Sequence, residues 1–124
     1  MMDHFSIHVW EIEKSKQFCT EALMPLGNEI KMDFGTAVSF GKKNSNGGDP
    51  AGSFWLTEGE PKHIHFAFSA SSREEVDAFY LAAIQAGGIS NGTPGIRSDY
   101  HENYYATFII DLDGYNIEAV YHGQ

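Results

Sequence analysis

The sequence has little of what marks a secreted, membrane or nucleic-acid-binding protein. It contains one cysteine, Cys19, in 124 residues, so an internal disulfide is excluded and the composition is typical of a reducing compartment. Basic residues are few: 8 Lys and Arg stand against 17 Asp and Glu, which gives a formal net charge of −9. Because so acidic a chain has no basic surface for phosphate groups, we expect neither nucleic acid nor membrane as a partner.

Long hydrophobic runs are also missing. No apolar stretch approaches the roughly 18–20 residues that span a bilayer. The first ten residues, MMDHFSIHVW, lack the basic start, apolar segment and cleavage site of a signal peptide. We therefore expect a cytoplasmic protein. The length suits one domain, or two small halves that share a core.

What the sequence does contain is an internal repeat. A strand-like run with alternating apolar and polar residues is followed by a helical pattern of apolar residues, and this order occurs twice: DHFSIHV (3–9) with 11–27, and HIHFAF (63–68) with 71–88. Phe18 and Phe79 are 61 positions apart, and so are Leu23 and Ile84. One offset therefore relates the two halves.

Three shorter strand-like runs follow each helical segment, at 29–34, 37–41 and 53–57 and at 89–97, 104–110 and 115–122. Each half thus has the order βαβββ. We predict a single α+β domain made of two βαβββ modules, about 1–60 and 61–124, which are related by a pseudo-twofold axis and form a concave mixed sheet cup.

The repeat selects two of the histidines. At an offset of 61, His4 matches His65, whereas His63 and His8 have no histidine counterpart. Equivalent residues face each other across a pseudo-twofold axis, so two imidazoles on the concave faces can approach one point. His4 and His65 are the candidate pair.

A carboxylate completes this set. On the last strand Glu118 lies between Ile117 and Ala119, which alternation assigns to the core, so Glu118 faces the histidines. A carboxylate pointing into a sheet's concave face is costly unless it is paired or binds a metal.

We predict that His4, His65 and Glu118 bind one divalent metal ion (Zn, Ni, Mn, Co or Fe(II)) and leave positions open for water or substrate. At the same offset the position equivalent to Glu118 is Thr57, a poor ligand, although the adjacent Glu58 leaves an uncertainty of one residue.

Three motifs carry a resemblance. DHFSIHV, HFAF and DLDGYNIEAV resemble the signatures of the glyoxalase/bleomycin-resistance/dioxygenase superfamily, also called the vicinal oxygen chelate superfamily. The resemblance covers nearly the whole chain and departs at Leu112, where the family usually has proline. It implies a glyoxalase-like fold, a homodimer, and a metal held by His4, His65 and Glu118 that chelates two oxygens of a small-molecule substrate.

Two functions follow from this resemblance. The first is a metal-dependent enzyme similar to glyoxalase or lactoylglutathione lyase, with lyase or isomerase chemistry on a small oxygenated substrate, a thiol conjugate being one option. The lack of a fourth ligand at Thr57 puts the glyoxalase I reaction itself in doubt. The alternative is a metal-free small-molecule binding protein similar to bleomycin-resistance proteins. A metal with a purely structural role is a third reading.

Further candidates for the site lie in the segment GIRSDYHENYYATF. Arg97 is its only arginine, and its guanidinium group can bind a substrate carboxylate or another anion. His101 can accept a proton near neutral pH. Tyr104 and Tyr105 are adjacent, so one faces inward and that one can donate to a chelated oxygen; Tyr105 is taken as the candidate.

Overall fold

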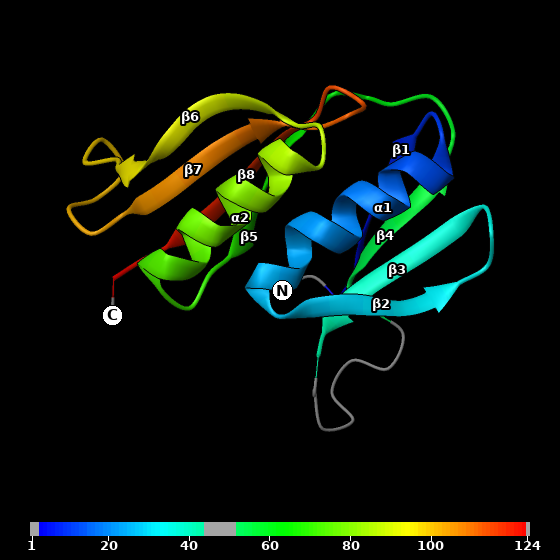
Figure 1. The fold of residues 1–124 in the computed structure, drawn as a ribbon, viewed down its shortest axis with the longest axis horizontal. Helices are drawn as coiled ribbons and strands as arrows, with labels where there is room; N and C mark the ends of the chain where they lie inside the picture. Colours follow the sequence, from blue (N-terminus) through cyan, green and yellow to red (C-terminus); the bar gives the residue numbers. More distant parts are fainter. Residues whose placement is uncertain (1–2, 44–51, 124) are drawn as a thin grey trace.

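A computed structural model of the chain describes residues 3–43 and 52–123. Each half has one strand, one helix and three further strands (Figure 1). The elements of the first half are β1 (Phe5–Val9), α1 (Ile12–Leu23), a 3₁₀ turn η1 (Met24–Leu26), β2 (Asn28–Asp33), β3 (Ala37–Lys42) and β4 (Phe54–Glu58). Those of the second half are β5 (His65–Ser69), α2 (Arg73–Gln85), β6 (Ile89–Ile96), β7 (Tyr105–Ile110) and β8 (Asn116–Tyr121). The predicted pair of βαβββ modules is confirmed.

The strands form two mixed sheets of four, ordered β1-β4-β3-β2 and β5-β8-β7-β6. In each sheet the first strand is parallel to the last strand of its module, and the other pairs are antiparallel. Figure 1 shows the two helices side by side, each against the strands of its own module. The sheets do not close into a barrel, so the face of each sheet opposite its helix stays open. Within the described residues no helix is long and apolar enough to span a membrane.

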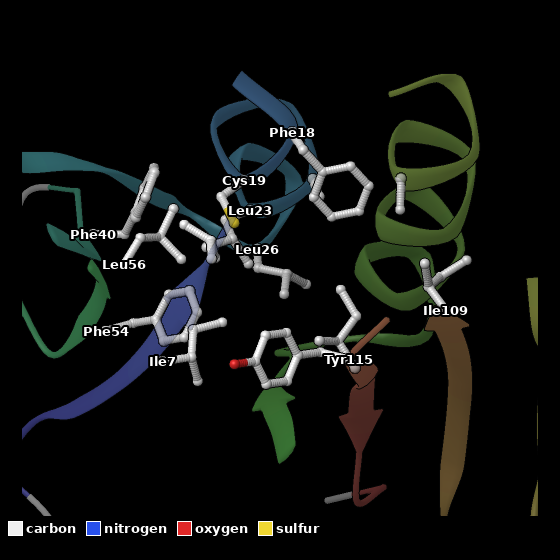
Figure 2. Close-up of a cluster of buried hydrophobic side chains, with 14 of the residues drawn as sticks. Ile7, Phe18, Cys19, Leu23, Leu26, Phe40, Phe54, Leu56, Ile109 and Tyr115 are labelled. Atoms are coloured by element: carbon white, nitrogen blue, oxygen red, sulfur yellow. The ribbon is translucent and has the colours of Figure 1, made fainter. Parts of the chain in front are cut away.

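The two modules share one hydrophobic core. Side chains from both halves meet in it, among them Phe18 of α1, Leu56 of β4, Ile109 of β7 and Tyr115 just before β8 (Figure 2). Phe5 and Phe66, which the offset of 61 makes equivalent, have ring centroids 5.2 Å apart. The two strands that open the modules therefore meet at the internal symmetry axis. Cys19 is buried in this core, and burial raises the pKa of its thiol, as expected for a residue that only packs.

The tight turn that precedes β8 ties the second module to the first. Asp113 is buried and accepts hydrogen bonds from the backbone N–H of Trp10 (2.8 Å) and from the Ser15 hydroxyl (2.6 Å). Both donors belong to the start of α1, whose own N-cap residue, Glu11, makes no side-chain cap. Asp113 thus anchors the start of a helix of the other module, and its negative charge suits the positive end of the helix dipole.

The start of α2 is capped locally instead. Ser72 accepts a hydrogen bond from the backbone N–H of Glu75 (3.1 Å), and the Glu75 carboxylate accepts one from the backbone N–H of Ser71 (2.8 Å). The two helices of the repeat are therefore alike in position but begin with different capping interactions.

Candidate metal centre

His65 and Glu118 meet on the open face of the second sheet. They lie on the neighbouring parallel strands β5 and β8, where Ala67 is opposite Glu118 and His65 shares the face of Ala67. The His65 Nε2 atom is 3.0 Å from the Glu118 Oε1 atom. The Glu118 side chain is only 4% exposed, whereas that of His65 is 47% exposed. The predicted inward direction of Glu118 is what this geometry shows.

Hydrogen bonds fix the orientation of both side chains. His65 Nδ1 lies 2.7 Å from the backbone carbonyl oxygen of Asn116. A carbonyl only accepts, so Nδ1 carries a proton and donates it. The other carboxylate oxygen of Glu118, Oε2, accepts a hydrogen bond from the Tyr104 hydroxyl. Burial and the hydrogen bond to Glu118 raise the pKa of Tyr104, so its hydroxyl stays protonated as the donor.

With these hydrogen bonds in place, a proton or a cation is needed between His65 Nε2 and the Glu118 carboxylate. With Nδ1 protonated, a neutral His65 imidazole would point the lone pair of Nε2 at a carboxylate oxygen 3.0 Å away, and two acceptors would face each other. A second proton on His65, a proton on the Glu118 carboxyl group or a bound cation removes that repulsion. One imidazole nitrogen and one carboxylate, each oriented by a further hydrogen bond, are donors that divalent transition metals accept. The residues present fit a metal ion.

His4 lies close to this pair but does not join it. It precedes β1 and, with His65, lines a cavity of about 440 Å³ at the junction of β1 and β5, where Phe5, Phe54, Phe66 and Phe68 form most of the apolar wall. Its Nδ1 atom is 3.0 Å from the Asp3 carboxylate. In residues 3–43 and 52–123 no three His, Cys, Asp or Glu side chains gather in a group able to hold a metal. Two of the three predicted ligands therefore meet, and the third stands at the shared cavity.

The first sheet has no counterpart of Glu118. Ser6 of β1 pairs with Trp55, as its equivalent Ala67 pairs with Glu118, so the residue structurally equivalent to Glu118 is Trp55 and not Thr57. The expected equivalence is corrected by two positions, because the segments between the strands differ in length in the two modules. Thr57 shares the open face with Trp55, and Glu58 points to the other side.

The two adjacent tyrosines separate as alternation requires. Tyr104 reaches Glu118. Tyr105, the predicted candidate, instead donates a hydrogen bond to Asp77 of α2 (2.6 Å) and lies under the Arg73 guanidinium group (5.0 Å from the ring centroid). Tyr105 is therefore on the helix side of the sheet. The structure brings Tyr104, and not Tyr105, to the candidate site.

A pair of histidines borders Tyr104. His101 Nε2 is 3.0 Å from His122 Nδ1, and both rings lie edge-on to the Tyr104 ring at 5.3 and 5.2 Å. The backbone N–H of Asn103 donates to His101 Nδ1, so a neutral His101 carries its proton on Nε2 and donates it to His122. The Tyr104 side chain thus lies between His101 and Glu118. Sequence reasoning gave no reason to pair it with His122, because the two come from different loops.

Arg97 lies on the same open face. Its guanidinium carbon is 5.5 Å from the centroid of the Phe108 ring, and that ring is 6.0 Å from the His65 ring. Phe108 is opposite Glu118 in the pairing of β7 with β8. The open face thus carries His65, Glu118, Tyr104 and Arg97 around one phenylalanine.

The comparisons with known proteins agree with the fold. Neither family models nor curated proteins matched the sequence, but many solved structures share the fold. A glyoxalase/bleomycin resistance protein from Albidiferax ferrireducens T118 is 29% identical, with a TM-score of 0.82 and 98% of each chain covered. This likeness in fold and sequence supports the resemblance to the glyoxalase/bleomycin resistance/dioxygenase superfamily.

More distant structures show the same superfamily fold. A glyoxalase/bleomycin resistance protein/dioxygenase family enzyme from Burkholderia phytofirmans PsJN is 13% identical, with a TM-score of 0.72 over 97% of each chain. A glyoxalase-related enzyme from Fulvimarina pelagi is 12% identical, with a TM-score of 0.72 over 98% of this chain and 87% of that one. In both cases the fold is similar although the sequence identity is low. The whole chain, rather than one module of it, corresponds to the superfamily fold.

Proposed function

We propose that the protein is a metal-dependent enzyme that chelates a small oxygenated substrate for lyase or isomerase chemistry, as its resemblance to the superfamily and the His65–Glu118 pair suggest. The observation that supports this most directly is the hydrogen bond from His65 Nδ1 to the Asn116 carbonyl. It turns the Nε2 lone pair toward a buried carboxylate, and a divalent ion there would satisfy both acceptors. His65 and Glu118 would hold the ion, and His4 would supply the third donor.

When bound, such an ion stabilises negative charge on substrate oxygens. The chain's own residues would do the rest. Tyr104 keeps the Glu118 carboxylate in place, and the Asn116 carbonyl keeps the His65 ring in place. The phenylalanine-lined cavity beside His65 would receive the apolar part of a substrate and exclude water from it. His101 is the proposed proton acceptor, although it acts at one remove, beyond Tyr104.

Metal binding tests the proposal directly. The purified protein, stripped with a chelator and then supplied with Zn²⁺, Ni²⁺, Co²⁺ or Mn²⁺, should retain about one ion per chain, measured by elemental analysis after gel filtration. His65→Ala and Glu118→Ala should lose it. His63→Asn is the matched control, since it removes a nearby histidine while asparagine tolerates the positive φ of 54° at that position. Retention of the ion by His65→Ala would contradict the proposal.

A separate experiment decides whether the His4 that would bind the metal belongs to the same chain or to a second copy. We expect the protein to form a homodimer, because β2 and β6 leave open edges at the outer ends of the two sheets. If His4 comes from the second copy, His4→Ala and His65→Ala variants will each fail to bind metal alone, and a mixed dimer of the two will regain one site out of two. If His4 comes from the same chain, the mixed dimer will regain none. Activity would then be screened with hemithioacetals, epoxides and acyl thioesters.

One observation favours a second function, a metal-free binding protein. The cavity at β1 and β5 is mostly apolar, and His4 is engaged with Asp3 instead of completing a three-donor group. A binding protein of this kind would take up an aromatic or aliphatic molecule in that cavity without any metal. Absence of bound metal after metal-supplemented refolding, together with metal-independent uptake of an apolar fluorescent dye that a Phe54→Ala variant loses, would support it over the enzyme.

A further inference from the structure

Arg97 differs from three of the lysines of the first module in having no carboxylate partner among the residues that the structure describes. Lys14, Lys16 and Lys31 each contact a carboxylate. Among residues 3–43 and 52–123, no carboxylate lies within ion-pair distance of Arg97, although Asp99 is only two positions away in the sequence. Arg97 is therefore a half-buried cation whose charge no described carboxylate neutralises, in a chain with a net charge of −9.

The guanidinium group of Arg97 is nevertheless held in one place. Its Nη2 atom donates a hydrogen bond to the Thr93 carbonyl (2.7 Å), and its flat face lies over the Phe108 ring. The backbone of Arg97 is fixed as well, since its N–H donates to the Tyr104 carbonyl (2.7 Å). One guanidinium hydrogen bond to a described residue leaves the other N–H groups free for a ligand.

Two glycines make room for this position. A Cβ atom on Gly92 would lie 3.1 Å from Arg97 Nη2, and one on Gly95 would lie 3.1 Å from Nη1. A side chain at Gly92 or Gly95 would therefore force the guanidinium group to shift. The two glycines of the sequence NGTPG therefore leave the space that the Arg97 guanidinium group occupies beside Phe108.

The Arg97 guanidinium group lies beside the candidate metal centre. Phe108 contacts the His65 ring on one side and the Arg97 guanidinium group on the other. A planar cation with paired N–H donors matches a carboxylate in a forked contact. We infer that Arg97 is an anion subsite that binds a carboxylate of the substrate. In this arrangement the chelating oxygens of the substrate lie at His65 and Glu118.

This inference rests on the proposed function for the identity of the ligand as substrate, but the subsite can be tested without metal. The metal-free protein would be titrated with benzoate and with benzamide, which have the same ring and differ in charge, while the Arg97 Nε–H signal and the β6 amide signals are followed by NMR. We expect benzoate to shift these signals with at least tenfold higher affinity than benzamide, and Arg97→Gln to abolish the difference.

Two matched variants separate a subsite from general charge. Arg73→Gln removes the same charge from the only other arginine, which also lies over an aromatic ring but on the helix side of the sheet, and it should leave benzoate affinity within twofold. Gly95→Ala keeps the charge and crowds the guanidinium group, and it should weaken benzoate at least fivefold. Equal affinity for benzoate and benzamide, or equal losses in Arg97→Gln and Arg73→Gln, would overturn the inference.

A metal-chelating probe distinguishes this subsite from the metal centre. Acetohydroxamate binds metals through two oxygens and carries no carboxylate. With the metal-loaded protein we expect Arg97→Gln to keep acetohydroxamate affinity within twofold and to lose benzoate, and His65→Ala to show the reverse. A wild-type protein that holds no metal but still prefers benzoate would refute the proposed function and keep the anion subsite. One that binds acetohydroxamate and shows no preference for benzoate would refute the subsite alone.

Discussion

At the scale of single residues, Tyr104 and Tyr105 show how one position along a strand changes the role of a side chain. Both hydroxyls donate to a carboxylate, but Glu118 is buried and Asp77 is exposed. A buried carboxylate that loses a donor keeps its desolvation cost, while an exposed one is compensated by water.

Removal of each hydroxyl should therefore have different effects. We expect Tyr104→Phe to lower the free energy of unfolding of the metal-free protein by about 1–3 kcal/mol, and Tyr105→Phe to lower it by less than about 0.5 kcal/mol. Urea denaturation followed by circular dichroism measures both. Equal losses in the two variants would show that Tyr104 does not support Glu118 in solution.

At the scale of elements, the turn from Asp111 to Gly114 does more than reverse the chain. Gly114 has a φ of 91°, which a residue with a side chain rarely adopts. Asp111 accepts hydrogen bonds from the backbone N–H groups of Asp113 and Tyr115 (2.9 Å each), and Asp113 binds the Trp10 N–H and the Ser15 hydroxyl at the start of α1.

The two hydrogen bonds to Asp113 should contribute more to stability than the local cap on α2. Asp113→Ala removes an acceptor from both Trp10 and Ser15, so we expect a loss of about 2–3 kcal/mol. Ser72→Ala removes one acceptor at a more exposed helix end, and a loss of about 1 kcal/mol is expected. Chemical denaturation of both variants checks the order; a larger effect for Ser72→Ala would contradict the structural role of Asp113.

The same turn predicts a pH dependence. Burial is the main cause that raises the pKa of Asp111 to about 6, against about 3.9 for an unfolded aspartate. Between these values the folded state binds the proton more tightly, so the contribution of this group to stability is present at low pH and is lost as the pH rises toward 6.

Asp111→Asn removes this titration and keeps the oxygen that accepts the two backbone hydrogen bonds. The stability of Asp111→Asn relative to the wild type should therefore be greater at pH 7 than at pH 4, by up to about 3 kcal/mol. Denaturation of both proteins at the two pH values gives the difference, in which the contributions of other groups cancel. A difference that does not change with pH would show that Asp111 titrates normally.

At the scale of the whole molecule, the two modules share a continuous hydrophobic core. Tyr115 of the second module is fully buried, and its hydroxyl donates to the His8 carbonyl of the first module (2.6 Å) and accepts from the backbone N–H of Lys62 (3.1 Å). The hydrogen bonds to Asp113 cross the same boundary.

We therefore expect the modules to unfold together. Tyr115→Phe should lower stability by about 1–2 kcal/mol and shift the unfolding of both halves equally. Hydrogen exchange of amides in α1 and in α2 measures this, and the two helices should lose the same free energy of opening. A change confined to α2 would mean that the modules are independent.

The sequence by itself determined the elements, their order, the two modules, and the face that carries His65 and Glu118. Local periodicity fixes these features, since a strand alternates with a period of two wherever it lies in the fold. It did not decide between Tyr104 and Tyr105, because YATFII carries apolar residues on both faces.

The tertiary structure alone decided which residues of different elements meet. It made Trp55 the structural equivalent of Glu118 and brought His101 to His122. It also placed Asp113 at the start of α1 and Arg97 beside Phe108. Such contacts depend on loop lengths and strand register, which a repeat offset counted along the chain does not include. The side chains that surround the candidate metal centre therefore come together only through the strand pairing of the second sheet.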